Sequence, residues 1–209
     1  FLVAEQMREI NVKPKKILLE PFGRNTAPAI TLSILKALEI EQNPLMLVLS
    51  SDHQINDEKT FSETINEGVQ YANQGKIVVF GTTPTAPETG YGYIKSQKPF
   101  VNNEKKGYKI EKYIEKPNLE TAKKLVKDKK YLWNSGIFLF RAKDMLAEIK
   151  KYAPNILENC KKSINVDLVD LDFERIDSEY FSKCDDISLD VAIMEKTNLG
   201  IVLPLDVGW

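Results

Sequence analysis

The chain has 209 residues, of which 43% are hydrophobic and 28% charged, which is ordinary for a globular protein able to bury most of its apolar surface without metals or disulfides. Lys and Arg total 29 and Asp and Glu total 30, and the net charge of −1 argues against a nucleic-acid-binding protein. The apolar runs, such as residues 45–49 and 137–140, are too short to cross a membrane, and no signal peptide is visible. Cys160 and Cys184 lack metal or redox spacing, so we expect reduced thiols in a cytoplasmic protein.

Apolar runs alternate with amphipathic stretches in the first part of the chain. The predicted elements are strands at 17–19, 45–49 and 77–80 and helices at 27–40 and 61–72. Thr26 is the expected N-cap of the first helix, and Gly75 ends the second. This order predicts parallel strands joined by helical crossovers, with ligands beyond the C-terminal strand ends. Glu20, Asp52 and Gly81 are therefore expected near that edge.

The second part of the chain predicts a more mixed pattern. Strands are expected at 91–96, 108–115, 133–140 and 200–205, and helices at 119–126, 142–151 and 189–195. The first two of these strands surround a polar loop at 102–107, and polar helical turns are expected to fill 155–183. No internal repeat or interdomain linker is visible, so the sequence predicts one α/β domain.

Two clusters of polar residues follow predicted strands in the first part. Residues 20–29 (EPFGRNTAPA) are expected to form a glycine-containing loop followed by the first turn of a helix. Arg24 and the free backbone N–H groups expected there could bind an anion or the edge of a base. Alternatively, this is a plain loop with a helix cap. Asp52 follows a buried strand and could hold Mg²⁺, although it could equally cap the next segment. His53 is the only histidine, and we assign it no acid-base role.

Three further clusters lie in the second part. Residues 88–93 (ETGYGY) contain two glycines that permit close backbone approach to a ligand, or a bulge between strands. Glu115 and Lys116 precede a proline, so both could face one sugar phosphate if the strand ends there, and they could otherwise be a solvated pair at a turn. Asn134 enters an apolar strand, where a polyhydroxyl ligand could satisfy its amide; an Asn-Ser-Gly turn is the alternative.

The sequences of these motifs and their order along the chain resemble those of mannose-1-phosphate guanylyltransferases across nearly the whole chain. The matching stretches are 20–29 (EPFGRNTAPA), 48–53 (VLSSDH), 80–94 (FGTTPTAPETGYGYI), 113–117 (YIEKP), 133–142 (WNSGIFLFRA), 189–197 (LDVAIMEKT) and 202–209 (VLPLDVGW). The Arg-Asn-Thr-Ala-Pro motif distinguishes this family from its thymidylyl- and uridylyltransferase relatives. The resemblance implies a Rossmann-like nucleotide-diphospho-sugar transferase fold, with a mixed, mostly parallel central sheet flanked by helices.

The resemblance also implies a role for each matching residue. It implies the nucleotide-binding residues Glu20, Arg24, Asn25 and Thr26, the sugar-binding residues Gly92, Glu115 and Asn134, and the catalytic residues Asp52 and Lys116. Asp52 would be the ligand of Mg²⁺, and Lys116 would lie near the sugar phosphate. GTP and mannose 1-phosphate are the implied substrates, a homodimer is the assembly to test, and neither nucleic acid nor a membrane is an expected partner.

The expected reaction is in-line attack of the sugar phosphate on the α-phosphorus of GTP, with loss of pyrophosphate. The family also has a Gly-rich loop with an Arg and a Lys, and a Ser-Asp-Val-Gly continuation after its Gly-Trp pair. Neither stretch lies between Phe1 and Trp209, so we expect residues 1–209 to be a nucleotidyltransferase domain truncated at both ends. The alternatives are a mannose-6-phosphate isomerase, alone or as a fused domain outside this segment, and a non-catalytic nucleotide-sugar-binding paralogue.

Overall fold

The computed structural model describes residues 2–101, 106–164, 169–170 and 173–208, and the chain falls into two compact units. One unit comprises Phe1–Gln42 and Leu146–Ile193, and the other comprises Asn43–Met145 and Met194–Trp209. They are called the first and the second unit below, and each is described by itself.

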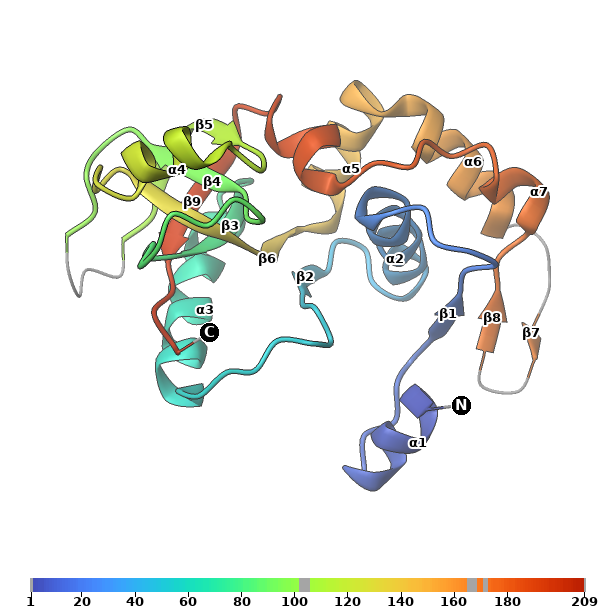
Figure 1. Ribbon diagram of the computed structural model, residues 1–209. Helices are drawn as coiled ribbons and strands as arrows, with labels where there is room; N and C mark the ends of the chain where they lie inside the picture. The colour runs from blue at the N-terminus through green and yellow to red at the C-terminus, as the bar shows by residue number, and fades with distance from the viewer. Residues whose placement is uncertain (1, 102–105, 165–168, 171–172, 209) are drawn as a thin grey trace. The chain divides into compact units, whose positions relative to one another are not determined.

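A six-stranded sheet forms the centre of the second unit (Figure 1). Its strands, in spatial order, are β2 (Leu45–Val48), β6 (Tyr131–Arg141), β3 (Ile77–Thr82), β9 (Gly200–Pro204), β5 (Tyr108–Ile114) and β4 (Tyr93–Ser96). Strand β4 also pairs with the first residues of β6. The helices of this unit are α3 (Glu58–Ala72), α4 (Leu119–Leu125) and the start of α5 (Ala142–Tyr152).

The strand directions make this sheet mixed. Strands β3 and β9 pair in parallel, whereas β6 runs antiparallel to both β2 and β3. Strands β2 and β3 therefore run in the same direction with β6 between them, as the predicted helical crossover through α3 requires. The prediction of an α/β fold with a mixed central sheet and flanking helices is confirmed. The expectation that the sheet is mostly parallel was wrong, because β3–β9 is its one parallel pairing among the described residues and the other pairings are antiparallel.

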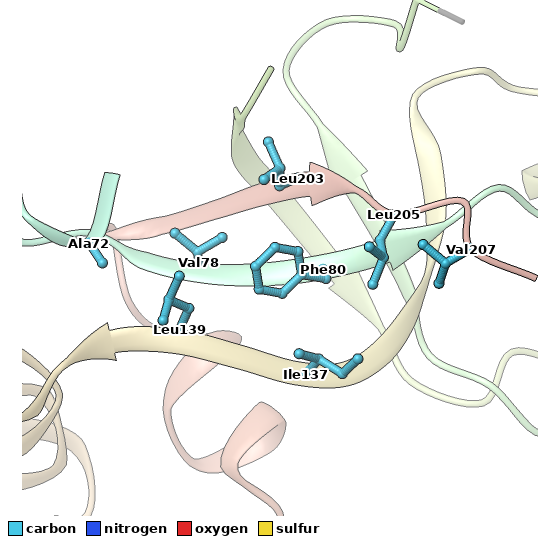
Figure 2. Packing of buried hydrophobic residues seen from close by; sticks show 8 residues of the cluster. All are labelled: Ala72, Val78, Phe80, Ile137, Leu139, Leu203, Leu205 and Val207. Carbon is cyan, nitrogen blue, oxygen red and sulfur yellow. The ribbon is translucent and has the colours of Figure 1, made fainter. Parts of the chain in front are cut away.

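Alternating apolar side chains give the sheet its core on the α3 side (Figure 2). The buried cluster consists of Ala72, Val78, Phe80, Ile137, Leu139, Leu203, Leu205 and Val207. Residues two apart on one strand share a face, which is why β3, β6 and β9 each contribute members. Phe61, Ile65 and Val69 of α3 pack against this cluster, so the apolar stripe predicted from their four-residue spacing is confirmed. Each fully buried side chain of this kind contributes about 1.5–3 kcal/mol of hydrophobic stabilisation.

The first unit is mainly helical and carries a small sheet of its own. Its elements are α1 (Leu2–Glu9), β1 (Ile17–Leu19), α2 (Thr26–Ile40), the remainder of α5, α6 (Pro154–Ile164), β7 (Val169–Asp170), β8 (Phe173–Arg175), α7 (Ser178–Phe181) and all but the last residue of a π-helical turn, η1 (Asp190–Met194). Helix α2 packs against α6. The sheet has the order β1-β8-β7, with β1 parallel to β8.

Two expectations about the strands of this unit were wrong. Strand β1 was expected to share a parallel sheet with residues 45–49, yet it pairs with β8, where Leu18 lies opposite Glu174. Glu174 of β8 forms ion pairs with Lys16, which precedes β1, and with Lys36 of α2, so charged contacts accompany this pairing. The stretch 155–183 was expected to be helical turns, but it also contains strands β7 and β8. The expected polar loop at 102–107 lies mostly outside the described residues.

Candidate active site

The loop between β1 and α2 is held in one conformation by its own residues. Asn25 is the N-cap of α2, and its side-chain oxygen accepts the Thr26 N–H at 3.0 Å. Its backbone angles, φ 62° and ψ −168°, belong to a region that is essentially reserved for glycine. The expectation of Thr26 as the cap was wrong, because the Thr26 hydroxyl instead accepts the Leu189 N–H at 2.9 Å. The Ala27 N–H donates to the Ile187 carbonyl at 3.2 Å, so residues 187–189 support the loop.

Arg24 is positioned by two contacts within the first unit. Its Nη2 donates to the Ser182 carbonyl at 2.7 Å, and its guanidinium carbon lies 5.3 Å from the centre of the Phe22 ring. The Arg24 Nε is buried and has no hydrogen-bond partner among the described residues. The guanidinium is thus oriented before any ligand arrives, while part of its donor capacity remains unused.

Glu20 lies at the end of β1 and is partly buried. Burial raises the pKa of its carboxyl, because a low-dielectric surrounding disfavours the charged form. One carboxylate oxygen, Oε1, is buried without a hydrogen-bond partner in the described part of the chain. A carboxylate in this state can accept a hydrogen bond from a ligand hydroxyl or amino group.

Gly92, Glu115 and Asn134 come together in the second unit. The Asn134 N–H donates to the Gly92 carbonyl at 2.8 Å. A Cβ atom placed on Gly92 would lie 2.6 Å from Glu115 Oε2 and 3.5 Å from the Cβ of Asn134. The Asn134 side-chain oxygen accepts the N–H of Gly136, whose φ is +70°. These contacts place a backbone carbonyl, a carboxylate and an amide in one spot, where they suit a polyhydroxyl ligand.

Lys116 and Glu115 lie where strand β5 has ended. The strand stops at Ile114, and Lys116 has a φ of 41°, so the two side chains do not diverge as they would in a regular strand. The Lys116 Nζ lies 3.8 Å from Glu115 Oε1, and both side chains are substantially exposed. Both side chains were expected to face one sugar phosphate only if the strand ended at this point, and the strand does end there.

A pocket of about 440 Å³ lies beside these residues in the second unit. Its lining includes Asp52, His53, Glu88, Tyr91 and Trp133. The Tyr91 and Trp133 rings meet edge to face with centroids 5.3 Å apart. Asp52 and Glu88 bring two carboxylates to the same pocket, although the described residues contain no group of three or more metal-ligating side chains.

The structure divides the expected site residues between the two units. Glu20, Arg24, Asn25 and Thr26 belong to the first unit, and Asp52, Gly92, Glu115, Lys116 and Asn134 belong to the second. The sequence reasoning missed Glu88, Tyr91 and Trp133 as pocket residues. Glu88 and Tyr91 lie in the same motif as Gly92, and Trp133 directly precedes Asn134. Their closeness in the chain to these predicted site residues was the sequence signal that could have identified them.

Comparison with known proteins identifies the class of this chain. The family model described as nucleotidyl transferase matches residues 1–209, and the chain therefore belongs to the nucleotidyl transferase family. A mannose-1-phosphate guanylyltransferase of Escherichia coli (strain K12) is 47% identical over 212 residues. That alignment covers 100% of this chain but 44% of the relative, so the chain spans less than half the length of the curated relatives it matches.

Two solved structures share this fold. One, described as mannose-6-phosphate isomerase from Helicobacter pylori, has 30% sequence identity and a TM-score of 0.86, covering 100% of this chain and 79% of that chain. Another, described as mannose-1-phosphate geranyltransferase from Thermus thermophilus, has 27% identity and a TM-score of 0.74, covering 97% of this chain and 62% of that one. Among the residues that the structure describes, none of the helices has the length and apolar character needed to span a membrane.

Proposed function

We propose that this chain transfers GMP from GTP to mannose 1-phosphate, giving GDP-mannose and pyrophosphate. The observation that carries the proposal is the meeting of Gly92, Glu115 and Asn134, with Lys116 beside them, in a chain of the nucleotidyl transferase family. The E. coli relative, a mannose-1-phosphate guanylyltransferase that is 47% identical to this chain, supports the choice of mannose 1-phosphate.

The proposed division of labour follows from the chemistry of each group. Glu115 accepts hydrogen bonds from sugar hydroxyls, and Asn134 can both donate and accept. Lys116 offsets the negative charge of the sugar phosphate, which allows its oxygen to approach the α-phosphorus of GTP. Arg24 takes the nucleotide, because a guanidinium favours anions and the Arg24 Nε has no hydrogen-bond partner among the described residues. Positioning and charge neutralisation then account for most of the rate enhancement.

Mg²⁺ is the metal we propose for this reaction. The carboxylates of Asp52 and Glu88 fit it, because Mg²⁺ usually takes one or two protein carboxylates together with phosphate oxygens. When bound, the ion supplies Lewis-acid stabilisation of the phosphates. The Asp52 side chain is exposed at the pocket and would hold the ion there.

The expected homodimer stays a prediction, which analytical ultracentrifugation can test.

The Helicobacter pylori structure, described as a mannose-6-phosphate isomerase, is the one relative named above that favours the isomerase alternative. Metal-dependent aldose-ketose isomerases of that type need several histidine ligands, and His53 is the only histidine of this chain. We therefore favour the guanylyltransferase for these residues. Incubating the intact protein separately with mannose 6-phosphate and with GTP plus mannose 1-phosphate decides between the two: the second pair should yield GDP-mannose and pyrophosphate.

Asp52→Asn tests the proposed metal ligand within this function. Replacing the carboxylate by an amide should lower Mg²⁺-dependent turnover by about 10²-fold or more, since Lewis-acid stabilisation is worth several kcal/mol. Asp128→Asn is the matched control in the same unit, because the Asp128 side chain caps a turn and accepts the Lys130 N–H. Near-normal Mg²⁺-dependent turnover of Asp52→Asn in the intact protein would remove Asp52 from the site.

A further inference from the structure

Cys160 and Cys184 face one another inside the first unit. They are 24 positions apart in the chain, and their sulfur atoms lie 3.8 Å apart. Both are free thiols, with Cys160 completely buried and Cys184 only 3% exposed. Cys160 belongs to α6, whereas Cys184 follows α7, so the fold brings together two thiols from separate elements.

The thiol pair lies next to the first turn of α2, close to the loop that precedes this helix. The Cys160 sulfur lies 3.8 Å from the carbonyl oxygen of Pro28, in the first turn of that helix. Ser182, two residues before Cys184, supplies the carbonyl that holds Arg24. The same connection continues to Ile187 and Leu189, which bind the loop at Ala27 and Thr26. Residues on both sides of Cys184 therefore hold the Arg24 loop through hydrogen bonds within one unit.

We infer that Cys160 and Cys184 form a reversible disulfide that alters the Arg24–Thr26 loop and weakens its grip on an anionic nucleotide. The first half of this inference, disulfide formation, depends only on the contact between the two sulfurs. The second half rests on the proposed function, because it takes the loop to be the nucleotide-binding segment. Hydrogen peroxide is the oxidant, since a molecule little larger than water is suited to a sulfur that is barely exposed.

The chemistry proceeds in two balanced steps. The Cys184 thiolate attacks one oxygen of hydrogen peroxide, the O–O bond breaks, and sulfenic acid and hydroxide form. Cys160 then attacks the sulfenic sulfur, its proton leaves with the hydroxyl group as water, and the S–S bond forms. The two thiols lose two electrons and the peroxide gains them. A hydrogen bond from the Cys160 thiol, helped by nearby Arg24, lowers the pKa of Cys184, which fits Cys184 as the first to react.

Bond formation changes the geometry on which the loop depends. A disulfide needs about 2.05 Å between its sulfurs, so the pair must close by about 1.8 Å from the present 3.8 Å. Cys184 is in the shorter and less regular connection, whereas Cys160 lies within an 11-residue helix, so we expect Cys184 to move. Because Ser182 is two residues from Cys184, this movement disturbs the 2.7 Å hydrogen bond by which the Ser182 carbonyl orients the Arg24 guanidinium.

Disulfide formation is tested on the intact protein. Reduced protein is treated with hydrogen peroxide, digested without reductant and analysed by mass spectrometry. A cross-linked peptide pair joining Cys160 to Cys184, together with loss of two free thiols and full reversal by dithiothreitol, is the expected result. Cys160→Ala and Cys184→Ala are the controls, since alanine fills a buried position without adding an unpaired polar group. Two intact thiols after treatment, or irreversible oxidation at one cysteine alone, would overturn the inference.

The effect on the loop is tested with two readouts. Amide hydrogen exchange of Ala27 and Leu189 should increase in the oxidised protein, and this needs no nucleotide. GTP affinity by calorimetry should fall about tenfold on oxidation, and reductant should restore it, while both alanine variants should show no change with peroxide. A disulfide that leaves both exchange and affinity unchanged would overturn the coupling. If reduced protein fails to bind GTP but its exchange still responds to oxidation, the proposed function fails and the coupling stands.

Discussion

Gly92 occupies a position where a side chain would collide with the Glu115 carboxylate, because a Cβ would lie 2.6 Å from Oε2. That oxygen is the far end of a flexible side chain, so Gly92→Ala should displace Glu115 at little cost in stability. Mannose 1-phosphate binding should weaken about fivefold or more, as expected for loss of one hydrogen-bonded partner. Gly90→Ala is the matched control, since a Cβ there meets nothing within 4 Å. Calorimetry and thermal melting of both variants check this, and equal sugar affinities would separate Gly92 from the site.

Glu20 predicts a pH dependence of stability. Burial raises the pKa of its carboxyl in the folded protein above its value in the unfolded chain. Folding therefore favours the protonated form, so this contribution is fully present below the unfolded pKa and is lost as the pH rises through the folded pKa.

Glu20→Gln should remove this dependence, because glutamine remains neutral at every pH. The variant and the natural protein should melt at nearly the same temperature near pH 4, and the variant should be the more stable at pH 7. Thermal melting across this range measures the difference, with the exposed Glu41→Gln as a control in the same unit. A stability difference that stays constant from pH 4 to pH 7 would mean that Glu20 is not the titrating group.

At the scale of elements, the sequence predicts most helices and strands of the second unit. The four-residue spacing of Phe61, Ile65 and Val69 predicts a helix with one apolar face, and α3 packs that face onto the sheet. Periodicity says which face of an element is buried but not which neighbour covers it. For that reason β1 was expected beside residues 45–49 instead of β8.

The grouping of the candidate site residues could be predicted from the sequence only in part. The resemblance named Gly92, Glu115 and Asn134 as one group, and the structure shows their contacts. It did not name Trp133, whose place follows from its register opposite Tyr93 in the pairing of β4 with β6. Register between strands far apart in the chain depends on the whole sheet, so no local pattern could supply it.

Asn25 at the start of α2 combines a stabilising helix cap with a strained backbone conformation, and two substitutions separate these effects. Asn25→Ala keeps the backbone conformation that disfavours side chains and loses the cap, so it should destabilise the protein by about 1 kcal/mol. Asn25→Gly also loses the side chain, but glycine adopts these angles freely and relieves strain of about 1–3 kcal/mol. Glycine should therefore raise the free energy of unfolding, as measured by urea denaturation. If both variants are destabilised equally, the loop is not strained.

At the scale of the whole chain, net charge offers no attraction to the proposed substrates. The net charge is −1, so a general positive field cannot concentrate two phosphorylated ligands. Each ligand must instead meet its own few groups. Arg24 belongs to the first unit, whereas Glu115 and Lys116 belong to the second, so the proposed nucleotide and sugar groups are built on separate compact parts of the chain.

This separation predicts that two substitutions act on different ligands. Arg24→Ala should weaken GTP binding about tenfold or more, because a charge-assisted contact is lost, and should change mannose 1-phosphate binding much less. Glu115→Ala should do the reverse, since the lost carboxylate accepts hydrogen bonds from the sugar hydroxyls. Calorimetric titration of each variant of the intact protein with each ligand gives four affinities to compare with the natural protein. If Arg24→Ala weakens the sugar phosphate more than GTP, the loop before α2 belongs to the sugar, and the proposed assignment of the two units is reversed.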